Sequence, residues 1–316
     1  MKKRRLGNSN LEVSPLCFGC NVFGWTVNES TAFALLDRLV SSGINFIDTA
    51  DVYCRWVPGN HGGESEIIIG NWLKRSKARD KVIIATKLGM EMEPGKKGLS
   101  KAYIFRSVED SLRRLQTDYI DLYQSHIDDP ATPFEETLSA YSELMRQGKV
   151  RAIGASNHNT QRLRESLRVA DQNGLPRYES LQPNYNLYDR AAYEAELETL
   201  CLEQGLGVIN YFSLAKGFLT GKYRSEADLS QSPRGAGVKQ YLNERGSRIL
   251  SALDQVAGRK DSTAARVSLA WLMARPSITA PIASATKVSQ LDDLIEATRL
   301  ELDSDSIRLL DQASAS

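Results

Sequence analysis

Residues 151–174 read "RAIGASNHNTQRLRESLRVADQNG", a short apolar run followed by a longer, more polar segment. The run at residues 151–156 has the length and apolar content of a buried strand. From residue 160 onward the apolar side chains recur at helical spacing, and the pattern stops at Gly174, a residue type that often ends helices. This stretch therefore predicts one strand followed by one helix.

The same unit recurs along the chain. Other short apolar runs occupy residues 16–20, 45–50, 82–87, 120–126, 179–184, 207–212 and 278–283. Helical spacing marks residues 29–43, 103–116, 133–149 and 191–205. Eight strands alternating with helices favour a closed α/β barrel, the (β/α)8 TIM barrel, over an open sheet. Because no linker rich in Ser or Pro divides the chain, we expect a single domain over residues 1–316, with an N-terminal β-hairpin and long loops at its C-terminal face.

Composition narrows the class of protein. A net charge of +1 gives no long-range attraction to nucleic acid or anionic lipid, and no apolar run has the length of a membrane span. No apolar segment follows the basic start "MKKRRLGNSN", so a secretory signal is not expected. Four scattered cysteines indicate a reducing, cytoplasmic setting, and Cys17 and Cys20 lack the second pair that a zinc site needs. We therefore expect no metal and a small-molecule substrate, in a monomer or homo-oligomer.

Polar residues follow several of the predicted strands. In a TIM barrel the chemistry lies at the carboxyl ends of the strands. Asp48, Lys87 and His126 stand at three such ends, and Tyr53 lies five residues beyond Asp48. Each has an ordinary explanation, since a lysine after a strand is usually solvated and a lone histidine is usually structural. Four titratable types at successive strand ends nevertheless favour a shared site, to which the next strand ends would add Ser156, Asn157 and Gln182.

These residue types fit proton donation to a carbonyl oxygen. A free phenol has a pKa of about 10, and an ammonium nearby lowers it. Lys87 is the right type for that role on Tyr53, Asp48 could hold Lys87, and His126 could orient the carbonyl. Carbonyl reduction also needs a hydride, which only a bound cofactor supplies. A barrel hydrolase, or a lyase in which Lys87 forms a Schiff base, remains an alternative.

The usual dinucleotide signatures are absent. Residues 19–24 read "GCNVFG", which is not G-x-G-x-x-G, and residues 217–222 read "GFLTGK", which is too short for a phosphate-binding P-loop. A nicotinamide cofactor would therefore bind here in another way.

Several stretches together resemble one known family. They are "NFIDTADVY" (45–53), "ATK" (85–87), "DYIDLYQSH" (118–126), "GKVRAIGASNH" (148–158), "SLQPNYNLYDR" (180–190) and "LAKGFLTGKY" (214–223). The chain looks like an aldo-keto reductase of the bacterial branch related to potassium-channel β subunits. The resemblance implies a barrel that binds extended NADPH without a Rossmann domain. It also implies a catalytic tetrad of Asp48, Tyr53, Lys87 and His126, with Tyr53 as the general acid. Because that branch includes channel subunits, a nicotinamide-binding regulatory subunit is the second function to consider.

The same resemblance implies cofactor contacts. Ser156, Asn157 and Gln182 would bind the carboxamide, and Tyr211 would stack on the nicotinamide ring. The remaining expected contacts are Phe212, Ser213, Leu214, Gly217, Lys222, Ala283, Ser284, Lys287, Gln290 and Asp293. The family often has arginine or lysine at or near Ala285 and another arginine where Gln290 stands, whereas here only Lys287 is nearby. NADPH with tolerance for NADH is therefore expected.

Substrate contacts are expected in the loops. Trp25, Trp56 and Tyr188 are candidates beside Tyr53 and His126, whereas His61 fits a turn before a helix. Residues 223–247 form a long polar segment, for which we expect a lid that brings Arg234 or Lys239 close to phosphate.

Overall fold

The eight predicted strands form one barrel sheet. The computed structural model describes residues 1–315, so Ser316, the last residue of the predicted domain, lies outside the description. The barrel strands are β3 (Cys17–Gly19), β4 (Phe46–Asp48), β5 (Ile83–Leu88), β6 (Ile120–Ser125), β7 (Val150–Ser156), β8 (Ser180–Gln182), β9 (Gly207–Val208) and β10 (Ile282–Ala283). The sheet order is β10-β3-β4-β5-β6-β7-β8-β9, with parallel pairing throughout.

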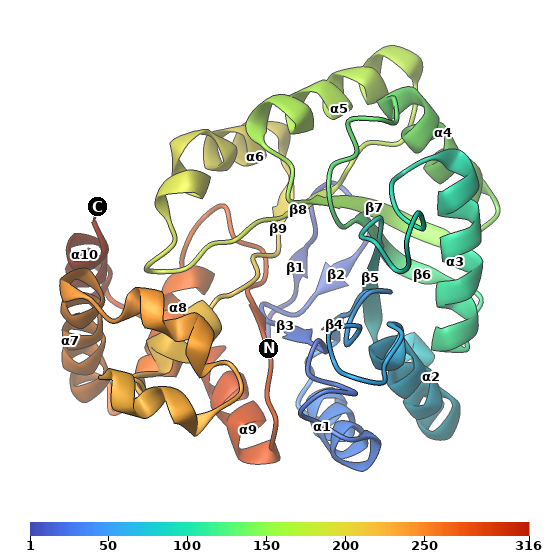
Figure 1. The fold of residues 1–316 in the computed structure, drawn as a ribbon. Coiled ribbons are helices and arrows are strands. Elements are labelled where there is room, and N and C mark those ends of the chain that lie inside the picture. The colour runs from blue at the N-terminus through green and yellow to red at the C-terminus, as the bar shows by residue number, and fades with distance from the viewer. Residues whose placement is uncertain (316) are drawn as a thin grey trace.

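The sheet closes between its first and last members. Backbone N–H groups of Ala280 and Ile282 donate to the carbonyls of Val208 and Asn210, over 3.2 and 2.9 Å. These bonds join the β9 side of the sheet to the β10 side, and helices surround the resulting ring (Figure 1). The predicted (β/α)8 TIM barrel is confirmed.

The helices follow the predicted pattern. They are α1 (Glu29–Ser41), α2 (Glu64–Ser76), α3 (Lys101–Leu115), α4 (Phe134–Arg146), α5 (Thr160–Asn173), α6 (Glu198–Gln204), α7 (Glu244–Arg259), α8 (Ala264–Met273), α9 (Val288–Ala297) and α10 (Ser304–Ser314). One predicted helix differs, because residues 191–205 include a π-helical turn, η2 (Tyr193–Leu197), before they continue as α6.

Local sequence sets the helix ends. Asn28, Ser100 and Asn159 accept a backbone N–H from three residues ahead and so cap α1, α3 and α5. At the other end, Gly174 and Gly205 adopt left-handed backbone conformations with φ of 60° and 61° and terminate α5 and α6. Nearby residues therefore determine where these helices begin and where they end.

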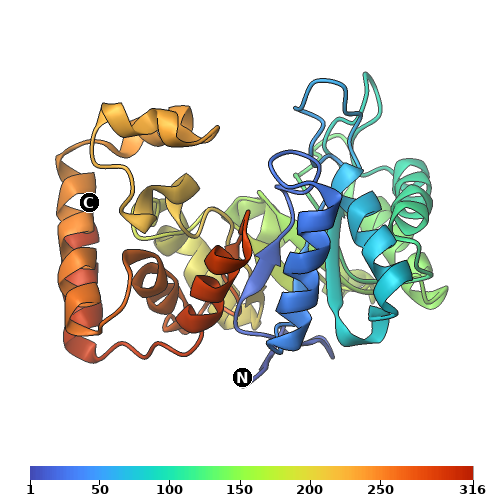
Figure 2. The same cartoon turned by 90° about the horizontal axis from the view of Figure 1, so that it is seen from below.

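The two ends of the barrel are different. The N-terminal hairpin, β1 (Arg4–Arg5) with β2 (Glu12–Val13), lies at one end, and the loops that follow the barrel strands extend at the other (Figure 2). Leu6, Leu11 and Val13 of the hairpin region are buried against side chains of the barrel interior such as Phe46 and Leu122. The hairpin therefore fills the amino-terminal end and leaves the carboxyl ends of the strands for a site.

The long polar segment at residues 223–247 is folded. It contains two short 3-10 helices, η4 (Glu226–Gln231) and η5 (Gly235–Tyr241), and then enters α7. Tyr223, Val238 and Tyr241 are buried and anchor it on the barrel. Throughout residues 1–315, the helices are too short or too polar to cross a bilayer.

Candidate active site

Strands β4 and β5 bring Asp48 and Lys87 together. Asp48 pairs with Ala85 in the sheet, and Lys87 lies two residues farther along β5, so it points to the same side of the strand. Lys87 Nζ lies 2.7 Å from Asp48 Oδ2 and 2.8 Å from the phenol oxygen of Tyr53. Its third bond goes to the carbonyl of Thr49, at 2.7 Å. The buried ammonium therefore has three acceptors, one of them the predicted acid.

The Asp48 carboxylate is held on its other side as well. Gln182 Nε2 donates to Asp48 Oδ1 over 3.0 Å, and Gln124 Nε2 lies 3.4 Å from the same oxygen. Both amides are buried in the barrel interior. Gln182, which we expected to contact the cofactor, thus also orients the carboxylate, whereas Gln124 was not predicted.

The surroundings of Tyr53 keep its phenol protonated. Burial and the nearby Asp48 carboxylate, 3.3 Å from the phenol oxygen, raise the pKa of Tyr53 well above its usual value. The net lowering of this pKa that we expected is therefore not found, because burial and the carboxylate that holds Lys87 both raise it. At neutral pH the group is available as a proton donor.

His126 completes the cluster from the end of β6. Its ring centroid lies 6.0 Å from that of Tyr53, and its Nδ1 is buried without a partner among the described residues. Burial, and then the charge of Lys87, lower the pKa of His126 well below 6.5. The imidazole is therefore neutral at physiological pH and can donate a single N–H to a ligand oxygen.

A large cavity opens above this cluster. It has a volume of about 1180 Å³, larger than most sites for drug-sized ligands. Of the predicted residues, those that line it are Asp48, Tyr53, Trp56, His126, Ser156, Asn157, Gln182, Tyr211, Phe212, Ser213, Leu214, Gly217, Lys222, Arg234, Ala283, Ser284, Gln290 and Asp293. The predicted catalytic and cofactor positions thus share one space, apart from Lys87 below it and Lys287 beside it.

Some predicted residues lie elsewhere. Trp25 packs behind Trp56, and Tyr188 packs on Tyr241, and neither lines the cavity. We expected both in the substrate pocket, but their loops turn the rings toward neighbouring aromatic side chains. His61 donates its backbone N–H to Glu64 at the start of α2, as expected for a turn residue.

Asn157 and Tyr211 are held together on one side of the cavity. Asn157 has a left-handed backbone, with φ of 56°, and its Nδ2 donates to the carbonyl of His126 over 2.9 Å. The phenol of Tyr211 donates to Asn157 Oδ1, also over 2.9 Å. The ring predicted to face a nicotinamide is thereby fixed relative to His126.

Three cationic side chains also line the cavity. Lys216, Lys222 and Arg234 each lack a carboxylate within 4.0 Å among residues 1–315, and Nη2 of Arg234 is buried without a hydrogen-bond partner. Of the two cations that we expected near phosphate, Arg234 lines the cavity and Lys239 does not. Lys239 pairs with Glu226 at 3.0 Å. Lys216 was missed, since a lysine in a loop usually looks solvated.

The comparisons with known proteins agree with this geometry. A model of the aldo/keto reductase family matches residues 15–315. This chain belongs to the aldo/keto reductase family. It is 36% identical to the oxidoreductase YrpG of Bacillus subtilis, over 98% of this chain and 95% of YrpG. It is 34% identical to the protein Tas of Escherichia coli, over 96% and 95%, and 30% identical to the norsolorinic acid reductase of Aspergillus flavus, over 97% and 79%.

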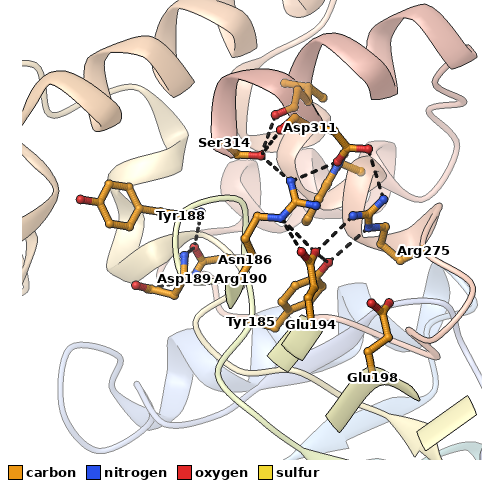
Figure 3. A network of polar contacts seen from close by, with 12 residues as sticks. Tyr185, Asn186, Tyr188, Asp189, Arg190, Glu194, Glu198, Arg275, Asp311 and Ser314 are labelled. Carbon is orange, nitrogen blue, oxygen red and sulfur yellow. Dashed lines mark hydrogen bonds and ion pairs between the residues drawn. The ribbon is translucent and has the colours of Figure 1, made fainter. Parts of the chain in front are cut away.

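A polar network supports the cavity wall of this aldo/keto reductase. Arg190 and Arg275 each contact both Glu194 and Asp311, which joins the π-helical turn to the segment after α8 and to α10 (Figure 3). The phenol of Tyr185 donates to Glu194 over 2.6 Å. These ion pairs and this hydrogen bond thus hold the turn at residues 185–189 in place.

The same turn holds the loop that carries Tyr211. Asn186 Nδ2 donates to the carbonyl of Phe212 over 3.0 Å, and Asn210 Nδ2 donates to the carbonyl of Tyr185 over 2.7 Å. Phe212 has φ of 53°, an uncommon conformation for a bulky residue, and these bonds stabilise it. The network therefore positions the predicted cofactor loop without touching the cavity itself.

The far end of the cavity is mostly neutral. Thr263, Thr286 and Gln290 line it, and Gln290 Oε1 accepts hydrogen bonds from the backbone and side chain of Thr286. Asp293 is the acidic residue there, and it pairs with Arg266 at 2.5 Å. Lys287 precedes α9 beside this end, so it is the cation closest in sequence to Thr286.

Proposed function

We propose that this protein is an NADP(H)-dependent oxidoreductase that reduces an aldehyde or ketone to the alcohol. The observation that carries this proposal is the phenol of Tyr53, which lies at the floor of a large cavity within 2.8 Å of a buried ammonium that is itself paired with a carboxylate. The family generally uses nicotinamide cofactors, which is consistent with a cavity of this size. NADPH is the proposed cofactor, with NADH tolerated.

The cavity fits a dinucleotide in charge and shape. Lys216, Lys222 and Arg234 give it cations without counter-charges among the described residues, which suits a pyrophosphate. Ser156, Asn157, Gln182 and Tyr211 would hold the nicotinamide end, and Leu214 and Gly217 line the wall between. When bound, the nicotinamide supplies the hydride that no side chain can donate.

The protein's own residues would handle the proton. Tyr53 gives its phenolic proton to the carbonyl oxygen as that oxygen becomes negative, and neutral His126 donates its N–H to the same oxygen. Lys87 then lies 2.8 Å from the phenolate that remains and stabilises it. Asp48 neutralises the Lys87 charge in the resting site. Proton transfer from a positioned group of this kind typically contributes about 10²- to 10⁴-fold in rate.

The proposed preference for NADPH rests on Lys287. It is one cation where a bidentate arginine would clamp a 2′-phosphate more firmly. The KM for NADPH should therefore be lower than that for NADH, but by a modest factor. A strong preference for NADH would contradict this part of the proposal.

The test of the function is oxidation of NADPH by the purified protein with a panel of aldehydes and ketones. Turnover on any of them supports the reductase. NADPH binding without turnover on any carbonyl would favour a regulatory nicotinamide-binding subunit. Borohydride trapping tests a Schiff-base enzyme, because a covalent adduct on Lys87 would replace the proposal by that chemistry.

A further inference from the structure

A buried amide lies in the barrel interior and takes no part in the proposed proton transfer. Gln124 is fully buried, and in the sheet it pairs with Lys87 on β5 and with Gly154 on β7. A Cβ atom at Gly154 would lie 3.2 Å from Gln124 Cγ, so the glycine leaves the space that this side chain fills. An amide enclosed in this way needs polar partners, because an unpaired one is costly to bury.

The partners of Gln124 are Asp48 and Gln182. Gln124 Nε2 lies 3.4 Å from Asp48 Oδ1, and Gln124 Oε1 accepts from Gln182 Nε2 over 3.3 Å. Gln182 Nε2 also donates to Asp48 Oδ1, over 3.0 Å. The three side chains thus form a closed triangle of hydrogen bonds, in which both N–H groups of the Gln182 amide are used.

The remaining polar atom of the Gln182 amide faces the cavity. Its Oε1 has no donor among residues 1–315 but is not sealed off, because Gln182 lines the cavity. Ser156 Oγ accepts from Asn157 Nδ2, and Asn157 Oδ1 accepts from Tyr211. Of the three residues predicted at the carboxamide, Gln182 is therefore the one whose side-chain oxygen still lacks a donor in the described part of the chain.

A nicotinamide carboxamide matches this free oxygen, since it has N–H groups to donate. Asp48 alone would fix one N–H of Gln182, and the amide could still rotate about that single bond. The second bond, to Gln124, fixes the plane of the amide and with it the direction of Oε1. A donor on Oε1 also strengthens the bond from Nε2 to Asp48, because linked hydrogen bonds polarise one another.

We propose that Gln124 is a positioning residue, which fixes the plane of the Gln182 amide so that Gln182 binds the carboxamide N–H of the nicotinamide and holds Asp48 at the same time. Cofactor recognition and the orientation of the proton-donating cluster are thereby joined through one side chain. Gln124 itself does not line the cavity, so it acts through Gln182 and Asp48. This inference rests on the proposed function, because it takes a nicotinamide as the ligand.

The test compares NADP⁺ with its 3-acetylpyridine analogue, in which a methyl group replaces the carboxamide NH2 and the carbonyl is kept. Calorimetric titration gives the Kd of each. The wild-type protein should bind NADP⁺ about tenfold more tightly, because the analogue leaves Gln182 Oε1 without a donor. Gln124→Met should weaken NADP⁺ binding about five- to tenfold and analogue binding less than about twofold, so most of the discrimination is lost.

Two further variants separate positioning from packing. Ser180 lies on β8, and its Oγ is buried without a partner among the described residues, so Ser180→Ala should keep the wild-type ratio of Kd values. Gln124→Glu retains an oxygen that accepts from Gln182 Nε2, so it should keep most of the discrimination. In Gln124→Met the kcat for carbonyl reduction should fall about three- to tenfold at unchanged KM for the carbonyl, because Asp48 loses a donor.

Equal Kd values for the two dinucleotides in the wild-type protein would overturn the inference without any variant. An equal loss of affinity for both in Gln124→Met would also overturn it, since a residue that only fills space would act in that way. Discrimination that depends on Gln124 in a protein that reduces no carbonyl would support the inference while the reductase function fails. Turnover without discrimination would mean the reverse, and if neither dinucleotide binds, both fail.

Discussion

The phenol of Tyr241 donates a hydrogen bond to Oδ2 of Asp189 across 2.8 Å. Tyr241 ends the folded segment over the cavity, and Asp189 lies in the turn that also supports the Phe212 carbonyl through Asn186. The ring of Tyr188 in the same turn packs edge-to-face on Tyr241 at 4.8 Å. One turn therefore contacts both the segment at residues 223–247, the predicted lid, and the loop of the predicted cofactor site.

Loss of this bond should speed cofactor release. Tyr241→Phe removes one hydrogen bond to a carboxylate, so the dissociation rate of NADPH should rise about three- to tenfold, and limited proteolysis should cut residues 223–247 faster. Stopped-flow displacement of NADPH measures the rate. Tyr103→Phe is the matched control, because its hydroxyl bonds to the Lys96 carbonyl outside the lid. Equal release rates in the two variants would contradict the claim that the bond between Tyr241 and Asp189 slows the release of NADPH.

The cations without a carboxylate partner, Lys216, Lys222 and Arg234, should provide much of the binding free energy for the phosphates of NADPH. Lys216→Ala, Lys222→Ala and Arg234→Ala should each weaken NADPH binding by about tenfold or more and make it less dependent on salt. Fluorescence titration at two ionic strengths gives both quantities. Lys239→Ala is the control from the same region, because Lys239 pairs with Glu226. If it weakens binding as much as the others, the assignment of charges around the cavity is wrong.

Ionised Asp51 should lower the free energy of unfolding. Burial, and then the charge of Glu66, raise the pKa of Asp51 well above 3.8, and its Oδ1 is buried with no partner among the described residues. The unfolded chain therefore loses this proton at lower pH than the fold does. The stability that protonated Asp51 contributes is complete below pH 3.8 and is lost as pH rises through the folded-state pKa.

Asp51→Asn removes that dependence on pH. The variant should melt about 2–4 °C higher at neutral pH, and the gain should grow as the pH rises above 3.8. Thermal melts from acidic to neutral pH test this, with the exposed Asp80→Asn as the control. A lower melting temperature at neutral pH would show that the Asp51 charge is instead stabilised in the fold.

Substitutions in the buried pair of Lys87 and Asp48 should change the melting temperature and the turnover in different ways. Lys87→Met leaves the Asp48 carboxylate buried without its cation, so both the melting temperature and the turnover should fall sharply. The double variant Asp48→Asn with Lys87→Met should recover much of the melting temperature but none of the turnover. Recovery of turnover in the double variant would contradict a direct role for the ammonium beside Tyr53.

The barrel could be predicted from the sequence because short stretches of residues indicate its strands and helices. Apolar runs gave the strands, and glycines such as Gly174 marked where helices end. The strand ends also pointed to Asp48, Lys87 and His126, since parallel strands in a barrel deliver their ends to one face. The structure brings these residues and Tyr53 together, as that reasoning expected.

The loops were less predictable for a physical reason. The direction of a loop side chain depends on contacts made far away in sequence, so the expected positions of Trp25 and Tyr188 in the cavity were wrong. Lys216 was missed because its orientation arises from left-handed backbone at Lys216 and Gly217 that no motif marks. The pKa of Tyr53 likewise depends on its burial and on the nearby Asp48 carboxylate, which residue types alone do not set.

The most direct test of the central claim is the rate of carbonyl reduction by Tyr53→Phe, measured beside its affinity for NADPH. The substitution keeps the ring and removes only the proton donor. Our account predicts that kcat/KM falls about 10²- to 10⁴-fold while the Kd for NADPH changes less than about threefold. Turnover close to that of the wild-type protein would contradict the assignment of Tyr53 as the acid and, with it, the proposed mechanism.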